Sequence, residues 1–269
     1  MALLMSLLSS ALVFGLQAGA CLSLAPAPYA PHAFTLQSGS VPGRDRPDEV
    51  SKLASRLKSQ AAAERREAAE QLGYLEDARA VGPLLEVLKD KDADVRAACV
   101  DALGFIGDKR AVGPLIALLK DDIAFVRGAA ARVLGQLVDA SAVEPLLVSL
   151  RDAQASVRSA SAFGLGSLKD ERALPELVRV LKDESPDVRA AASTALGSLR
   201  DKRGVDPLIQ LLKDESRLVR VAAAISLADI GDKRAVAALN DAVTNEKEDE
   251  PRTQMKESLQ RLKAAPDPS

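Results

Sequence analysis

The stretch that decides the fold runs from residue 181 to residue 199 and reads LKDESPDVRAAASTALGSL. Its Val-Arg-x-Ala-Ala segment aligns with similar segments before and after it, and the arginine recurs at a constant interval of thirty-one places. The six arginines are Arg65, Arg96, Arg127, Arg158, Arg189 and Arg220. An aspartate stands twelve places after each of them, at Asp77, Asp108, Asp139, Asp170, Asp201 and Asp232. Six units in register at this period indicate a solenoid of helix pairs.

Each unit is expected to form two helices of roughly 12 to 15 residues. In residues 108–121, Asp108 is a candidate N-cap and apolar residues then recur at helical spacing. A proline near the start of this first helix, such as Pro114, predicts a kink or a delayed start. The second helix, over residues 95–106, places its apolar side chains on one stripe. Gly104 lies inside that helix, and its recurrence in five of six units predicts close approach of a neighbouring helix.

A helix at about 47–59 and a last pair at about 233–263 bracket the six units. We therefore predict an all-α fold over residues 47–263. The expected architecture is a right-handed α-solenoid of about seven antiparallel helix pairs, a superhelix of HEAT-like or armadillo type. Residues 264–269 are expected to form a disordered tail.

The repeat resembles the HEAT-like family typified by phycobilisome lyase proteins. The residues that carry the resemblance are Leu181-Lys182-Asp183, Val188-Arg189-Ala190-Ala191-Ala192 and Leu196-Gly197-Ser198-Leu199. The resemblance implies the fold but leaves the function open, because similar arrays occur in chromophore lyases, in a peptide-lysine hydroxylase, beside reductase domains and in scaffolds.

Composition restricts the chemistry of the chain. The 36 basic and 38 acidic residues nearly balance, so no basic footprint for nucleic acid is present. His32 is the single histidine and lies outside the repeats, which removes the His-Glu iron site that hydroxylases of similar sequence use. Cys99 occupies a slot held by small residues in other units and is expected to be an inert buried thiol. We expect no catalytic residues, no metal and no cofactor.

Residues 1–43 contain no charged residue and are expected to direct export. An apolar run ends in Ala18-Gly19-Ala20-Cys21, a small-x-small site typical of signal peptidase cleavage. The run is about 15 residues long, short of the roughly 20 that span a membrane. The same residues resemble a lipobox, in which Cys21 would be lipidated, although Ala18 stands where leucine is usual and no Lys or Arg precedes the run.

The expected organisation follows from this leader. Residues 1–20 are a signal peptide or lipoprotein leader, and residues 21–46, which are rich in proline, are a disordered tether. The protein is then periplasmic, secreted or anchored to a membrane only through the leader or a lipid on Cys21. Simple cleavage and lipidation both stay open, and a misassigned start would make the protein cytoplasmic.

The repeated arginines and aspartates are expected to be structural. In repeats of similar sequence, the arginine and an aspartate of the inter-helix turn form a hydrogen-bonded ladder from unit to unit. We expect the six arginines and the Asp77 series to form this ladder.

We expect the residues that bind a partner at the positions where the repeats differ. The places two before and one, five and nine after each arginine vary in chemistry and lie on a face of the second helix away from the core stripe. All four aromatic residues of the repeats occupy them, although aromatic residues in helical proteins usually belong to the core. The expected partner contacts are the aromatics Tyr74, Phe105, Phe125 and Phe163, the polar residues Asp101 and Arg132, and an apolar patch of Leu218, Val221 and Ile225.

These features predict a non-catalytic, monomeric scaffold that binds a protein or peptide on the concave face of the array. Two alternatives stay open. One is an enzyme or enzyme subunit by kinship, either similar to a bilin lyase or associated with an oxidoreductase. The other is a purely structural spacer, which would have no specific partner.

Overall fold

The computed structural model describes residues 47–266, and these residues form only helices and turns. The predictions about the leader, the tether, His32 and Cys21 concern residues outside this range. The longer helices have even numbers: α2 (Ala62–Leu75), α4 (Ala93–Ile106), α6 (Ala124–Leu137), α8 (Ala155–Leu168), α10 (Pro186–Leu199), α12 (Arg217–Ile230) and α14 (Asp249–Ala264). The odd-numbered helices are α1 (Pro47–Arg56), α3 (Val81–Val87), α5 (Val112–Leu118), α7 (Val143–Ser149), α9 (Leu174–Val180), α11 (Val205–Leu211) and α13 (Val236–Asn245).

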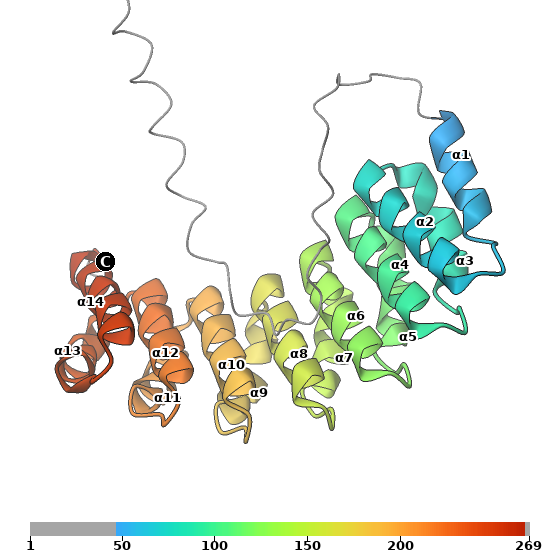
Figure 1. The fold of residues 1–269 in the computed structure, drawn as a ribbon. Helices are drawn as coiled ribbons and strands as arrows, with labels where there is room; N and C mark the ends of the chain where they lie inside the picture. The colour runs from blue at the N-terminus through green and yellow to red at the C-terminus, as the bar shows by residue number, and fades with distance from the viewer. Residues whose placement is uncertain (1–46, 267–269) are drawn as a thin grey trace, which may run out of the picture. The chain divides into compact units, whose positions relative to one another are not determined.

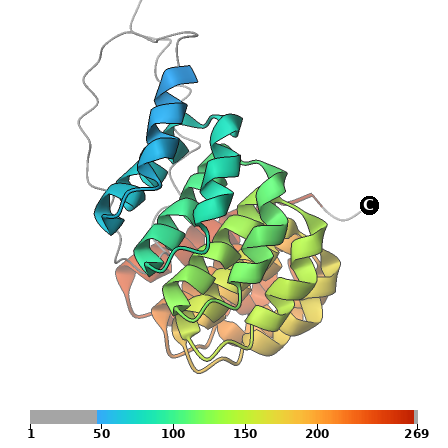
Figure 2. The same ribbon diagram turned by 90° about the vertical axis from the view of Figure 1, so that its right-hand side faces the viewer.

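The helices follow one another in chain order as seven pairs, which confirms the predicted all-α solenoid (Figure 1). Figure 2 turns the N-terminal end of this row toward the viewer. One hydrophobic core runs through the row, from Val50 in α1 to Leu262 in α14. One of its repeated elements is the leucine seven places after each ladder arginine, fully buried at Leu72, Leu103, Leu134, Leu165, Leu196 and Leu227. No described helix is both long and apolar enough to cross a membrane.

Most odd-numbered helices are shorter than predicted, because their first turn is a 3-10 helix. In the second unit, the side chain of Asp108 accepts a hydrogen bond from the Arg110 backbone N–H and starts the 3-10 turn Lys109–Ala111. The α-helix begins only at Val112, so Pro114 lies in its first turn, where a missing N–H costs least. The capping role of Asp108 and the delayed start are therefore confirmed.

The even-numbered helices pack closely through their glycines. A Cβ built on Gly73 would lie 2.8 Å from the Cα of Ala102, and one on Gly135 would lie 2.5 Å from the Cα of Gly164. The backbones of α2 and α4 and those of α6 and α8 therefore approach closely, as the recurrence of glycine predicted, whereas Gly104 of α4 meets side chains of α6. Successive odd-numbered helices make at most isolated contacts with one another.

Even-numbered helices in the six repeat units end at a residue with left-handed backbone conformation. Gly107 and Gly231 occupy this place with φ of 72° and 75°. The other four units use residues with a side chain, at Glu76, Val138, Lys169 and Arg200. The left-handed region costs an L-residue about 1–2 kcal/mol and is least suited to β-branched side chains such as that of Val138.

Val138→Gly is expected to raise the free energy of unfolding by about 1 kcal/mol. The substitution removes backbone strain at an exposed position, and the gain exceeds the extra entropy that glycine loses on folding. Denaturant unfolding followed by circular dichroism measures the change. Gly107→Val is the reciprocal variant and should lower stability by a similar amount; unchanged stability in both variants would contradict this account.

Candidate partner-binding face

The variable positions of the second helices form an exposed surface, here named the even-helix face. It comprises the residues two before and one, five and nine after each ladder arginine. Its four aromatic residues, Tyr74, Phe105, Phe125 and Phe163, are 50–68% exposed. The core positions beside them are filled by leucine, valine and alanine, so the aromatic side chains take no part in the continuous core.

The structure brings two of these aromatics together. Tyr74 and Phe105 occupy equivalent places near the ends of α2 and α4, and their ring centroids lie 5.9 Å apart. Phe125 is the second residue of α6, and Phe163 lies in the middle of α8. At a rise of about 1.5 Å per residue, the place of Phe125 is offset by roughly 16 Å along the helix axis from that of Phe105. The aromatics are therefore spread over the face.

The apolar patch on α12 is smaller than predicted. Ile225 is exposed, whereas Leu218 and Val221 are half-buried. Leu218 packs against a small cluster of Ala190, Val219 and Ala222. Ala190 was expected on the exposed face but is buried, because the neighbouring helix α12 covers it.

Asp101 and Arg132, predicted as polar contacts, form an ion pair with each other across α4 and α6. Both side chains are still partly open to solvent. Burial raises the pKa of Asp101, and the Arg132 guanidinium only partly offsets this effect.

The ladder arginines use their whole guanidinium group. Arg158 donates from Nε and Nη2 to the two carboxylate oxygens of Asp183, at 2.8 and 2.7 Å. Its Nη1 donates to the backbone carbonyls of Asp152 and Ala153, at 3.0 and 3.2 Å. The same arrangement repeats in every unit with the carboxylate partners Asp90, Asp121, Asp152, Asp183, Asp214 and Glu246.

The ladder partners are therefore not the aspartates predicted from the sequence. The expectation for Asp77, Asp108, Asp139, Asp170, Asp201 and Asp232 is wrong, because each of these caps its own 3-10 turn and accepts from the backbone N–H two residues later. In the first five units, the residue that forms the ladder stands twenty-five places after the arginine, in the turn between the two helices of the next pair, as Asp90 lies between α3 and α4. The hydrogen bond from Arg65 lowers the pKa of Asp90, and Arg127 does the same for Asp152.

A seventh arginine of the series was not predicted from the sequence. Arg252 donates to the carbonyl oxygens of Glu246 and Lys247, as the ladder arginines do to the turns before them. It stands one place later than the repeat period predicts from Arg220, because the segment from Asp232 to the ladder carboxylate Glu246, which contains α13, is one residue longer than in the other units. Aligning the aspartates of the turn as well as the arginines would have shown this shift.

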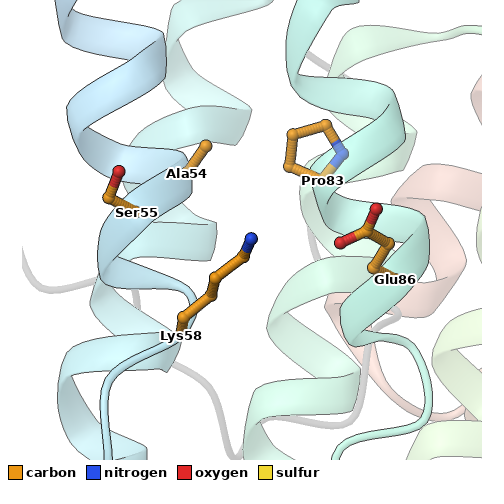
Figure 3. Close-up of a pocket in the computed structure, with 5 residues that line it drawn as sticks. All are labelled: Ala54, Ser55, Lys58, Pro83 and Glu86. Carbon is orange, nitrogen blue, oxygen red and sulfur yellow. The ribbon is translucent and has the colours of Figure 1, made fainter.

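Two hollows of the described surface are lined by none of the four aromatics. A shallow cavity of about 190 Å³ lies between α1 and α3 and is lined by Ala54, Ser55, Lys58, Pro83 and Glu86 (Figure 3). A second, of about 480 Å³, lies beside α11, α13 and the turn before α14.

Among residues 47–266, no group of three or more His, Cys, Asp and Glu side chains is placed to hold a metal ion. Cys99 is fully buried, and burial raises the pKa of its thiol to about 12, as expected for an inert packing residue.

Comparisons with known proteins agree on this architecture. A family model described as HEAT repeats matches residues 50–127, 124–184 and 175–260. The chain is similar to the solved complex of CpcE and CpcF of phycocyanin lyase from Nostoc sp. PCC7120, with 21% identity over 88% of this chain and 100% of that chain and a TM-score of 0.56.

Two further structures show the same fold. The Escherichia coli protein YibA is 19% identical over 84% of this chain and 99% of its own, with a TM-score of 0.54. The complex of Kap95p with RanGDP gives 15% identity over 79% of this chain and 36% of that chain, with a TM-score of 0.61. At these identities the likeness shows the fold alone. No curated protein matches the sequence.

Proposed function

Because the chain belongs to the HEAT repeat family, we propose that it is a non-catalytic scaffold that binds a segment of another protein along the even-helix face. HEAT-repeat arrays commonly mediate protein interactions, and the CpcE–CpcF and Kap95p–RanGDP structures are both complexes between proteins. The observation that carries the proposal is the exposure of all four repeat aromatics on one face. Exposed aromatic side chains are frequent anchors at protein interfaces.

We place this face on the inside of the curve of the array. The support is the difference in spacing between the two layers of helices. From α2 to α12, consecutive even-numbered helices approach closely at glycines, whereas successive odd-numbered helices make at most isolated contacts. In a bent two-layer stack, the more closely spaced layer lies on the inner side, so the aromatics would line a concave surface. The desolvation that raises the pKa of Asp101 fits the same arrangement.

Changing Phe105, Phe125 and Phe163 together to serine is expected to abolish partner binding. The three side chains contribute exposed surface and no continuous core, so the helical circular dichroism spectrum should stay unchanged. Pull-down of the partner with the full chain measures the loss. A structural spacer would give no specific partner in the first place.

The matched control is Val148→Ser. Val148 is 71% exposed but lies on α7, in the odd-numbered layer. This variant removes an exposed apolar side chain outside the even-helix face and should retain the partner. Retained binding by the triple variant, or equal loss in the control, would contradict a binding role for the even-helix face.

A further inference from the structure

The even-helix face carries an excess of negative charge. Including α14, with Arg252 as its reference, seven of its positions hold carboxylates: Glu70, Asp94, Asp101, Asp187, Asp229, Glu250 and Glu257. Three positions hold arginine: Arg66, Arg132 and Arg261. None holds lysine, although the chain has fourteen lysines and all of them lie at or beyond residue 52. The positive charges of the array are therefore concentrated on other surfaces.

Each arginine of the face is already paired within the chain. Arg66 lies 3.6 Å from Glu70 in the same helix, and Arg132 pairs with Asp101 of the preceding even-numbered helix. Arg261 pairs with Asp229. The four remaining carboxylates, Asp94, Asp187, Glu250 and Glu257, are exposed and form no ion pair within residues 47–266. A partner anion would find no unpaired cation on this face, whereas a partner cation would find four carboxylates.

A local role accounts for part of this charge. Asp94, Asp187 and Glu250 are each the second residue of a helix, where a carboxylate interacts favourably with the helix dipole. That role does not require a carboxylate here, since Phe125 and Leu218 occupy the same place in α6 and α12. It also does not explain Glu257, which lies in the middle of α14.

We propose that the partner segment is basic and extended, and that it runs along the first turns of the even-numbered helices. This inference rests on the proposed function and specifies its ligand. The exposed or half-buried side chains along that row, from α4 to α14, are Asp94, Phe125, Ser156, Asp187, Leu218 and Glu250. The row contains three negative places and two apolar ones, with Ser156 between Phe125 and Asp187. Lysine or arginine of the partner meets the negative places and aliphatic side chains meet the apolar ones. Phe125 can also contact a cation through its ring.

The spacing of the row sets the register of the segment. Packed helices lie about 8–10 Å apart, and an extended chain in the polyproline II conformation covers that distance in one turn of three residues at about 3.1 Å each, so that every third side chain points the same way. The partner therefore presents one side chain to every helix at intervals of three residues. Basic residues belong opposite α4, α10 and α14, and apolar residues opposite α6 and α12.

The probe is a synthetic 16-residue peptide with lysine at positions 1, 10 and 16, leucine at positions 4 and 13, and Gly or Ser elsewhere. Its affinity for the full chain is measured by fluorescence anisotropy at low and physiological salt. We expect saturable binding that weakens as salt rises. A peptide with glutamate in place of the lysines should bind at least tenfold more weakly.

The test variant is Asp94→Asn, Asp187→Asn and Glu250→Gln combined. The matched control combines Glu86→Gln, Glu144→Gln and Asp206→Asn, three exposed carboxylates on the odd-numbered helices α3, α7 and α11. Both variants gain the same net charge. The lysine peptide should bind the test variant about tenfold more weakly and the control like the unchanged chain. Thermal unfolding of each variant verifies that binding is measured on folded protein.

Two results would overturn the proposal. One is equal binding of the lysine peptide to the test and control variants, which would indicate only net-charge attraction. The other is no preference for the lysine peptide over the glutamate peptide. Neither result bears on the scaffold function, because the triple phenylalanine variant tests that function with the native partner. Conversely, retained native binding by the phenylalanine variant would refute the scaffold proposal whatever the peptide does.

Discussion

Arg158→Ala is expected to lower the free energy of unfolding by about 3–5 kcal/mol. The arginine side chain is about 10% exposed and its two fork nitrogens bind both oxygens of Asp183, which is itself almost covered. Removing the arginine leaves a buried carboxylate without its counter-charge and two turn carbonyls without a donor. Breaking a buried ion pair on one side costs about this much because the surviving charge stays desolvated.

Denaturant unfolding followed by circular dichroism measures this loss. Arg172→Ala is the control: Arg172 also pairs with an aspartate, Asp170, but its side chain is 48% exposed and the pair is local to one turn. An exposed pair contributes little to stability because water screens it, so the control should stay close to the unchanged protein. Equal losses in the two variants would contradict the ladder, and lost partner binding at unchanged stability would assign Arg158 a direct functional role.

The ladder also shows that the repeat period alone does not identify which aspartates pair with the arginines. Two aspartate series repeat with the same period, one twelve and one twenty-five places after the arginine. The first series is used locally, as when Asp77 binds the backbone N–H and side chain of Arg79 two residues later. The second faces the arginine of the preceding unit only after the helices stack. Spacing along the chain does not reveal that contact.

The fold itself was predictable because its determinants are local and repeated. Buried leucines, capping aspartates and glycines at fixed places define each helix pair, and stacking follows from their register. The exposure of the aromatics was predictable for a related reason, since leucine, valine and alanine already fill the core. The contact between Tyr74 and Phe105 was not, because it depends on how neighbouring helices are offset.

Deviations from the repeat were the hardest features to predict. The segment that contains α13 gains one residue, so Glu246 replaces the ladder aspartate and Arg252 falls outside the register of the other arginines. Ala190 is covered by α12 although its equivalents elsewhere are more open. Each of these deviations belongs to one unit of the array, and the averaged pattern of the repeat does not contain it.

Gly135→Ala is expected to lower the free energy of unfolding by about 3 kcal/mol, at the upper end of overpacking costs. The added Cβ would lie 2.5 Å from the Cα of Gly164 and 3.0 Å from its carbonyl oxygen. Both are backbone atoms of α8, so no side chain can rotate away and the helices must separate. The separation would open the core that α6 and α8 share, and the higher helix propensity of alanine, about 1 kcal/mol, offsets only part of the loss.

Two other glycines provide graded controls for this packing argument. A Cβ on Gly104 meets side-chain atoms of Val133 and Gln136 at 3.0 Å, and these can shift, so Gly104→Ala should cost less than Gly135→Ala. A Cβ on Gly113 meets nothing within 4 Å, so Gly113→Ala should be neutral or slightly stabilising. The denaturant midpoint should therefore be lowest for Gly135→Ala, intermediate for Gly104→Ala and highest for Gly113→Ala. A similar gain in stability in all three variants, as helix propensity alone predicts, would contradict a role for these glycines in the contact between neighbouring helices.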